Sequence, residues 1–317
     1  MRTIHPAYLL SLLLSVGSAP LFGAEPTPTS APAFTVPPPH SFAVGALRCH
    51  ILFDTDMDYA ANAFFINAPA AQLTAALAPY GGKVTTPYAA LLIETGQQRV
   101  LIDTGMGPTG NPREGHLLES LKRAGFSPEQ IDVVVITHGH LDHIGGLVQP
   151  DGKLTYPRAR FVIDKREWDF WAADQPNLAS VNIPDKARER WIEIAHQQLL
   201  PLRDRITLAA PNAEIVPGVR FVDAAGHTPG HSLVRLDSEG KNLLYVSDLV
   251  LSPVSLEHPD WYARYEYDVL AAQVSKQRIL KQAADEHLHV WAMHFAYPGL
   301  GYVVADGDHW KWEVATD

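Results

Sequence analysis

Four potential metal ligands lie within six residues of the sequence: His138, His140, Asp142 and His143. They follow directly after the β-branched run 131–136, which predicts a buried strand, so they stand at the end of that strand. His138 and His140 are two positions apart and project to the same side of an extended backbone. Side chains of this kind crowded together are stable when a divalent cation supplies a counter-charge. The segment therefore predicts a metal site, and a polar surface loop is a much weaker interpretation.

This segment resembles the metal-binding motif of the metallo-β-lactamase superfamily, in which His-x-His-x-Asp-His is followed here by Gly145-Gly146. The similarity continues in order along the chain and covers residues 41–312. It is carried by Leu101-Ile102-Asp103-Thr104-Gly105, Gly226-His227-Thr228-Pro229-Gly230-His231, Ser247-Asp248 and His294. Within the superfamily the chain most resembles the methyl parathion hydrolases and the related N-acyl homoserine lactonases, on segments 169–171, 247–251 and 294–299.

The resemblance implies two metal sites that share one carboxylate. The implied ligands of the first ion are His138, His140 and His227, those of the second are Asp142, His143 and His294, and Asp248 bridges both. The superfamily more often has glycine where Ser247 stands, beside this bridging ligand. We expect that departure to alter the strand geometry slightly without removing metal binding.

Five imidazoles and two carboxylates suit zinc, or iron, cobalt or manganese, better than calcium or magnesium. Two such ions about 4 Å apart clamp a bridging hydroxide, lower the pKa of its parent water towards roughly 7, and stabilise the attacking and leaving oxygens. The sequence therefore predicts a dinuclear hydrolase that attacks a carbonyl or a phosphorus, with Asp142 or Asp248 receiving the proton. Within the sequence, no Gly-x-Ser-x-Gly motif and no reactive cysteine setting competes with this site.

Other residues are expected to surround the ligands. Asp103 follows a predicted hairpin strand and is expected to hydrogen-bond the metal loop, and His231 is expected to support a ligand from behind. Trp171 and Trp191 are expected to form an apolar wall over the metals. An aromatic pocket in an acidic protein favours neutral, apolar esters, lactones or phosphotriesters as substrates.

Two other functions remain open. A mononuclear iron persulfide dioxygenase shares several of these ligands, and oxygen consumption with one iron per chain would identify it. An exported protein that only binds metal could use the same ligands and would hydrolyse no ester. Two further alternatives are weaker, because a classical β-lactamase is not expected to have the bridging Asp248, and a glyoxalase II-like thioesterase adds a basic C-terminal segment that residues 300–317 lack.

The elements that must position these residues alternate between strands and helices. Short apolar runs predict strands over 88–94, 99–103, 131–136, 161–163, 219–223, 232–236, 242–246 and 288–292. Apolar residues at helical spacing predict helices over 114–124, 165–173, 185–200 and 269–284. Hairpins mixed with helix-linked strands predict an α/β fold, an αββα sandwich in which two central mixed sheets are flanked by helices.

The N-terminal region has a different character. Residues 1–24 combine Arg2, the apolar run 9–16 and small residues near their end, which predicts a signal peptide cleaved near Ala19 or Ala24. Residues 25–40 are rich in proline and predict an extended arm, and the hydrolase domain is expected over residues 41–317. The mature protein is therefore expected to be exported, periplasmic or secreted, with no membrane span after the leader is cleaved.

The charge and the cysteine content of the sequence limit the kinds of partner that the protein can bind. The 317 residues include 35 acidic and 25 basic ones, for a formal net charge of -10, and no cluster of basic residues stands out, which argues against nucleic acid as a partner. Cys49 is the single cysteine of the sequence, so an intramolecular disulfide framework and a cysteine-rich metal site are excluded. The expected partner is a small-molecule substrate, and a homodimer is left open.

Overall fold

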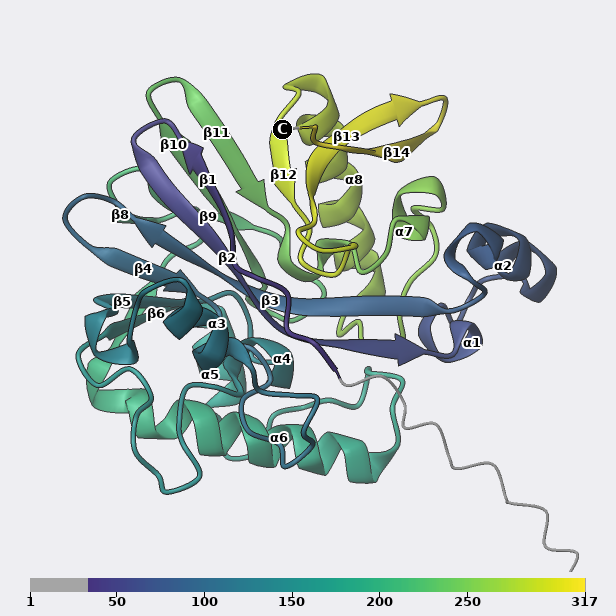
Figure 1. The fold of residues 1–317 in the computed structure, drawn as a ribbon. Coiled ribbons are helices and arrows are strands. Elements are labelled where there is room, and N and C mark those ends of the chain that lie inside the picture. The colour runs from purple at the N-terminus through teal and green to yellow at the C-terminus, as the bar shows by residue number, and fades with distance from the viewer. Residues whose placement is uncertain (1–33, 317) are drawn as a thin grey trace, which may run out of the picture. The chain divides into compact units, whose positions relative to one another are not determined.

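Two seven-stranded sheets face each other in the computed structural model of the protein, which describes residues 34–316 (Figure 1). The first sheet contains, in spatial order, β1 (His40–Val44), β2 (Leu47–Tyr59), β3 (Val84–Glu94), β4 (Arg99–Ile102), β5 (Val133–Ile136), β6 (Arg160–Asp164) and β7 (Ile206–Ala209). The second contains β14 (His309–Val314), β13 (Leu300–Asp306), β12 (His289–Trp291), β11 (Lys241–Tyr245), β10 (Ser232–Ser238), β9 (Val219–Asp223) and β8 (Glu214–Val216). Both sheets are mixed, because β4 to β7 pair in parallel in the first sheet and β11 pairs in parallel with β12 in the second.

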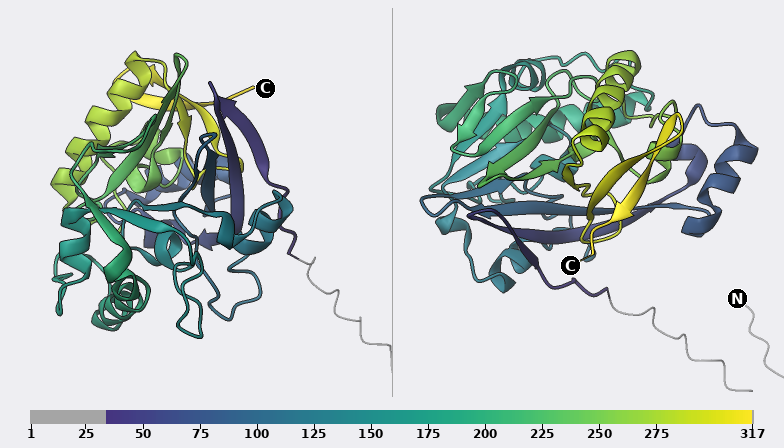
Figure 2. Two further views of the ribbon diagram at one scale, coloured as in Figure 1. Left: turned by 90° about the vertical axis from the view of Figure 1, so that its left-hand side faces the viewer. Right: turned by 90° about the horizontal axis from the view of Figure 1, so that it is seen from above.

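Helices cover the outer faces of both sheets (Figures 1 and 2). Those on the first sheet are α3 (Leu117–Arg123), α4 (Leu141–Ile144), α5 (Lys165–Trp171) and α6 (Asp185–Leu199), and α8 (Val269–Asp285) packs on the second. The remaining helices are the short α1 (Ala61–Phe64), α2 (Ala70–Leu77) and α7 (Val254–Glu257). The αββα sandwich predicted from the sequence is therefore confirmed.

Strand β5 shows why the sequence folds into these layers. Successive side chains of a strand point to opposite faces, so a strand between two apolar layers is apolar at every position. Val133 and Val135 join the cluster between the two sheets, whereas Val134 and Ile136 join the cluster under α3 to α6. All four side chains are fully buried. The strand is thus buried to its last residue, and the predicted metal motif begins two positions later, at His138.

Most of the predicted elements occur within a few residues of their expected bounds, but the longest strand was not predicted. Strand β2 pairs with β3 along its whole length, with a bulge between Phe53 and Thr55. Its charged residues at positions 54, 56 and 58 alternate with Thr55, Met57 and Tyr59, which is the period-two pattern of a half-exposed strand, so the sequence carries a strand signal here although no continuous apolar run marks it. Extensive pairing with β3 and burial of one half stabilise the strand in spite of these charges.

The predicted signal peptide 1–24 lies outside the described residues, as do residues 25–33 of the predicted proline-rich arm. The last residues of the arm contact the folded domain. Arg123 donates to the carbonyls of Val36 and Pro37 at 2.8 and 3.3 Å, and the Tyr297 hydroxyl donates to the carbonyl of Pro38 at 2.8 Å. Across residues 34–316, no helix is long and apolar enough to cross a membrane.

Candidate metal centre

The seven predicted ligands come from five segments that meet at one edge of the sandwich. His138 and His140 follow β5, and Asp142 and His143 lie in α4 directly after them. His227 lies in the loop between β9 and β10, which is joined to the first segment by a hydrogen bond from the Ser232 N–H to the Thr137 carbonyl. The other two ligands, Asp248 and His294, follow the adjacent parallel strands β11 and β12.

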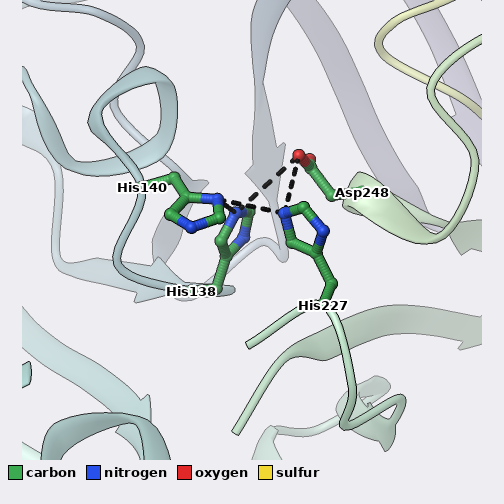
Figure 3. A group of neighbouring side chains, drawn as sticks. All are labelled: His138, His140, His227 and Asp248. Atoms are coloured by element: carbon green, nitrogen blue, oxygen red, sulfur yellow. Dashed lines mark hydrogen bonds and ion pairs between the residues drawn. The ribbon is translucent and has the colours of Figure 1, made fainter. Parts of the chain in front are cut away.

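The first group consists of His138, His140, His227 and Asp248, and all four side chains point to a common centre (Figure 3). Nδ1 of His140 lies 3.1 Å from Nε2 of His138 and 3.0 Å from Nε2 of His227. Oδ2 of Asp248 lies 3.2 Å from Nε2 of His227 and 3.8 Å from Nε2 of His138. These residues are all buried.

The second group consists of Asp142, His143, Asp248 and His294. Here the other oxygen of Asp248, Oδ1, lies 2.9 Å from Nε2 of His143 and 3.1 Å from Nε2 of His294. Oδ2 of Asp142 lies 3.3 and 3.9 Å from the same two nitrogens. Asp248 therefore presents one carboxylate oxygen to each group.

The residues of both groups fit divalent metal ions. A tetrahedral zinc ion about 2.1 Å from each ligand separates the ligand atoms by roughly 3.4 Å, and the observed separations bracket this value. In His143, Nδ1 donates to Asp103 at 2.8 Å, which leaves the lone pair of Nε2 directed into the second group. That Nε2 atom is buried and has no hydrogen-bond partner among the described residues. A metal ion would satisfy it.

Two other histidines have their tautomer set in the same way. Nδ1 of His227 contacts Glu266 at 3.1 Å, and Nδ1 of His294 contacts the carbonyl of Pro87 at 3.0 Å. A carboxylate or a carbonyl accepts a proton from Nδ1, so the Nε2 lone pair of each ring is free to bind a cation.

The electrostatics of the first group also suit a cation. Burial and the neighbouring imidazoles hold the pKa values of His138 and His140 well below the ordinary histidine value, so both rings are neutral and can act as ligands. Burial opposes ionisation of Asp248, but the surrounding histidines outweigh it and hold the pKa of that carboxyl well below its usual range. Burial opposes protonation of His227 and His143 as well, but the neighbouring carboxylates outweigh it and raise both pKa values, that of His227 to about 10, so binding of a cation at these two rings would displace a proton.

The two predicted supporting residues lie behind the ligands. Asp103 has its backbone in the left-handed region, with φ 61°, and its Oδ1 accepts the Thr137 N–H at 2.9 Å. Its Oδ2 accepts from Nδ1 of His143 and, at 2.9 Å, from the hydroxyl of Tyr245. His231 donates from Nδ1 to the Ala224 carbonyl at 3.1 Å, and its Nε2 accepts the backbone N–H of Asp248 at 3.3 Å. His231 belongs to neither ligand group.

A cavity of about 250 Å³ opens over both groups. Five of the seven ligands line it, and the other lining residues are Met57, Tyr59, Phe64, Thr86, Tyr88, Met106, Leu141, Trp191, Leu251 and Tyr265. The ring of Trp191 lies 4.6 Å from that of His140, centroid to centroid. The walls are therefore mainly aromatic and apolar, and the floor carries the two carboxylates Asp142 and Asp248.

Trp171, which was also predicted to line this cavity, does not. It is only 1% exposed and packs in the core beneath the first metal loop, where its indole N–H donates to Glu167 at 2.7 Å. Trp171 and Trp191 lie on α5 and α6 respectively, and the packing of each helix decides which ring reaches the cavity. The prediction that Trp171 forms part of the cavity wall is wrong.

The sequence profile of the metallo-beta-lactamase superfamily matches residues 85–317, which is more than half of the chain. The chain belongs to this superfamily. Among curated relatives, N-acyl homoserine lactonases of a Bacillus species and of Bacillus cereus are 21% and 23% identical over 224 residues, which is 64% of this chain and 80% of each relative. With these homologues and this fold, the chain is a metal-dependent hydrolase of the metallo-beta-lactamase superfamily.

Two solved structures are similar over almost the whole domain. AidC, described as a dizinc quorum-quenching lactonase in complex with a product, N-hexanoyl-L-homoserine, is 29% identical with a TM-score of 0.83, over 88% of this chain and 98% of AidC. AbOPH, a hydrolase of the beta-lactamase superfamily, is 25% identical with a TM-score of 0.81, over 89% of this chain and 99% of AbOPH. Together with the two His/Asp groups, the dizinc neighbour indicates two metal ions.

The departure from the superfamily pattern at Ser247 has a structural explanation. Ser247 adopts φ 43°, in the left-handed region that glycine enters without steric cost. Its hydroxyl donates to the hydroxyl of Thr137 at 3.1 Å, which connects the segment carrying Asp248 to the segment carrying His138. The serine thus adds a hydrogen bond to a position whose backbone favours glycine.

Sequence reasoning missed two buried glutamates of this metallo-beta-lactamase centre. Glu266 contacts His227, 39 positions away, and Glu167 accepts hydrogen bonds from both histidine-bearing loops. Neither stands in a recognisable motif, because one lies in an irregular segment and the other on an ordinary amphipathic helix. A glutamate on the buried face of α5, one turn before Trp171, is the only signal that could have indicated Glu167.

Proposed function

We propose that this hydrolase opens lactone rings that carry an apolar acyl chain, using two divalent metal ions bound by the two ligand groups. The observation that carries the proposal is Asp248, whose two oxygens face the two groups at the floor of a largely apolar cavity. A carboxylate shared in this way fits two ions held side by side, and the cavity above it fits a neutral substrate.

When bound, two divalent ions supply a hydroxide nucleophile at neutral pH and polarise the carbonyl oxygen of the substrate. The protein residues hold the substrate and move the proton. Trp191, Phe64 and Leu251 exclude water from the acyl chain. Asp142 and Asp248 both line the cavity, so either carboxylate can receive the nucleophile's proton and return it to the alkoxide that leaves when the ring opens. Water is added across the ester bond, and the product is a hydroxy acid.

The charge of the cavity favours neutral substrates over polyanions. Neither lysine nor arginine occurs among its described lining residues. Ribonuclease TTHA0252 of Thermus thermophilus is 27% identical over 180 residues, but the match spans only 37% of that ribonuclease. A nuclease needs basic side chains along its phosphate backbone track, and this cavity offers none. The N-acyl homoserine lactonases among the relatives support lactones as the substrate class.

Metal analysis combined with a substrate panel tests the proposal. Protein purified without added metal is analysed for transition metals and then assayed, with zinc, on an N-acyl homoserine lactone, an alkyl γ-lactone, an aryl ester, an aryl phosphotriester and nitrocefin. We expect two ions per chain and the highest kcat/KM on the lactones. One iron per chain with oxygen consumption would instead indicate a persulfide dioxygenase, and bound metal without turnover of any substrate would indicate a metal-binding protein.

We also propose that the two ions are zinc and that the mature protein is exported. The donor set of five imidazoles and two carboxylates supports zinc over calcium or magnesium. The charged start and apolar core of residues 1–24 support export. N-terminal sequencing of the secreted or periplasmic fraction should find a start shortly after Ala19 or Ala24. An intact Met1 in the cytoplasmic fraction would contradict export.

A further inference from the structure

Glu167 is a buried carboxylate with no cation partner among the described residues. It lies in the first turn of α5 and is 0% exposed. Four donors surround it instead. Oε1 accepts the Gly139 N–H at 2.8 Å and the Trp171 indole N–H at 2.7 Å, and Oε2 accepts the Thr228 hydroxyl at 2.7 Å and the Gly230 N–H at 2.8 Å. Burying a carboxylate is costly, and full hydrogen bonding of both oxygens offsets the cost.

Three of these donors belong to the two loops that carry the histidines of the first group. Gly139 stands between His138 and His140, and Thr228 follows His227 directly. One carboxylate therefore holds the backbone between His138 and His140, and in the other loop the side chain that follows His227 and the backbone of Gly230. The hydrogen bonds of Glu167 include no residue of α4 and none of the segment around His294, which supply the ligands proper to the second group.

The two loops also contact α5 without space for a further atom. A Cβ at Gly139 would lie 2.4 Å from the indole of Trp171, and a Cβ at Gly230 would lie 2.3 Å from the backbone nitrogen of Glu167. Such contacts are well below van der Waals distance, so both positions require glycine for close approach. Glu167 and Trp171 thus pack directly against both histidine loops and fix the distance between them.

We propose that Glu167 is a positioning residue for the first metal site: it sets the separation of the two histidine loops, and its loss weakens metal binding there without weakening the second site. The inference rests on the proposed pair of metal ions. Through the two loops, Glu167 brings three imidazoles together. Nδ1 of His140 lies 3.1 Å from Nε2 of His138 and 3.0 Å from Nε2 of His227.

The substitution that tests this is Glu167→Gln, which keeps the shape of the side chain. A glutamine oxygen still accepts two of the four donors, but its NH₂ group then faces the N–H and O–H donors of the other pair. Two single-site backgrounds separate the two groups. His294→Ala disables the second group and leaves the first, and His140→Ala disables the first and leaves the second.

Zinc affinity is measured in each background by competition with a chromophoric chelator. In the His294→Ala background, Glu167→Gln should weaken zinc binding on the order of 10- to 100-fold, the usual effect of removing a hydrogen-bond partner behind a ligand. In the His140→Ala background the same substitution should leave the affinity unchanged. Cobalt absorption spectra of both backgrounds provide a second readout, since a displaced histidine changes the ligand-field bands.

Asp54→Asn is the matched control. Asp54 is also 0% exposed and accepts two backbone N–H groups, from Met106 and Leu117, at 2.7 and 2.9 Å, but it contacts neither histidine loop. It should destabilise the fold without changing zinc affinity in the His294→Ala background. An equal loss of affinity in Asp54→Asn and Glu167→Gln would show that general destabilisation is responsible, and the inference would fail.

A milder pair of variants covers the case in which Glu167→Gln does not fold. Thr228→Val removes one donor to Oε2, and Thr228→Ser retains it. Thr228→Val should weaken the first site and Thr228→Ser should restore it. Equal affinities in these two variants, or an equal loss in both single-site backgrounds, would overturn the role of Glu167. Fewer than two ions on the unmodified protein would refute the proposed dinuclear function, while the His294→Ala background would still test Glu167.

Discussion

The two ligand groups share Asp248 but are supported in different ways. The first group draws three histidines from two loops, and carboxylates behind it hold both the loop backbones and the ring of His227. The second group relies on Asp103 behind His143 and on a backbone carbonyl behind His294. Its remaining ligand, Asp142, has a side chain that is 19% exposed and faces the cavity.

This difference separates a site whose histidine loops are held from behind by carboxylates from a site that includes a partly exposed ligand. A ligand whose backbone and ring are both fixed loses little freedom when a metal binds, and a ligand that faces the cavity can move with the substrate. The first group is therefore suited to retaining its ion, and the second to exchanging ligands during turnover. This difference between the two sites can be tested by substitutions of the residues behind each ligand group, of the shared Asp248 and of the cavity wall.

The largest effect is expected from Asp248→Ala, because this carboxylate belongs to both groups. Removing it should lower kcat/KM on a lactone on the order of 10³-fold, which corresponds to about 4 kcal/mol of lost metal-ion stabilisation of the transition state. The metal content should fall below two ions per chain at limiting zinc. A variant that retains two ions and unchanged turnover would remove the bridge from the mechanism.

The next effect is expected from Asp103→Asn, which complements Glu167→Gln. Asparagine tolerates the left-handed backbone of this position and keeps one oxygen for the Thr137 N–H. Its NH₂ group would face Nδ1 of His143, so zinc affinity at the second site should fall roughly 10- to 100-fold. Chelator competition in the His140→Ala background measures this loss. The same loss of affinity in the His294→Ala background would contradict the prediction that Asp103 stabilises only the second site.

A smaller effect is expected in the cavity wall, where the two tryptophans should behave differently. Trp191→Ala should raise KM for a long-chain acyl lactone about tenfold, within the 1–3 kcal/mol typical of apolar pocket contacts, and change γ-butyrolactone hydrolysis little. Trp171→Ala should instead lower the free energy of unfolding by about 3–5 kcal/mol, as truncation of a core tryptophan does. Urea denaturation and steady-state kinetics of both variants make the comparison. Equal losses on the two substrates in Trp191→Ala would place this ring outside the acyl site.

The smallest effect is expected at Ser247. Ser247→Gly relieves the left-handed backbone but loses the hydrogen bond to Thr137, so its free energy of unfolding should stay within about 1 kcal/mol of the parent. Ser247→Ala keeps the strain and loses the same bond, and it should be the less stable of the two by about 1 kcal/mol. Thermal unfolding of the metal-free variants measures the difference. If Ser247→Ala were as stable as the parent, the hydroxyl would contribute nothing.

The ligands could be predicted from the sequence because their signal is local or matches a known pattern. Four of the seven lie within six residues after one apolar run, and β5 buries that run as expected. The residues that hold the ligands from behind could not be predicted in the same way. Glu167 and Glu266 act on loops 28 and 39 positions away, respectively, and their burial depends on how α5 and the segment before α8 pack. A contact between residues so far apart in the sequence depends on tertiary packing and leaves no local sequence pattern that predicts it.

The same limit explains the error at Trp171. Both tryptophans stand on helices predicted close to their observed bounds, and helical spacing alone does not state which ring faces the metals. The tight contact between Gly139 and α5 turns Trp171 inward, against the loop backbone. A local pattern therefore located the element correctly, and its tertiary neighbours decided the role of the side chain.

The shared carboxylate has a further consequence for how the centre fills. When one group holds an ion, Asp248 is already oriented for the other, so the conformational freedom lost by this side chain is lost only once. Linkage then requires reciprocity: whatever factor the first ion contributes to the affinity of the second, the second contributes to the first. The shared orientation of Asp248 favours joint loading, whereas repulsion between two cations that share one carboxylate opposes it. The fraction of half-loaded molecules under scarce metal therefore reports which contribution is larger, and a threshold in total activity would show that the orientation of Asp248 prevails.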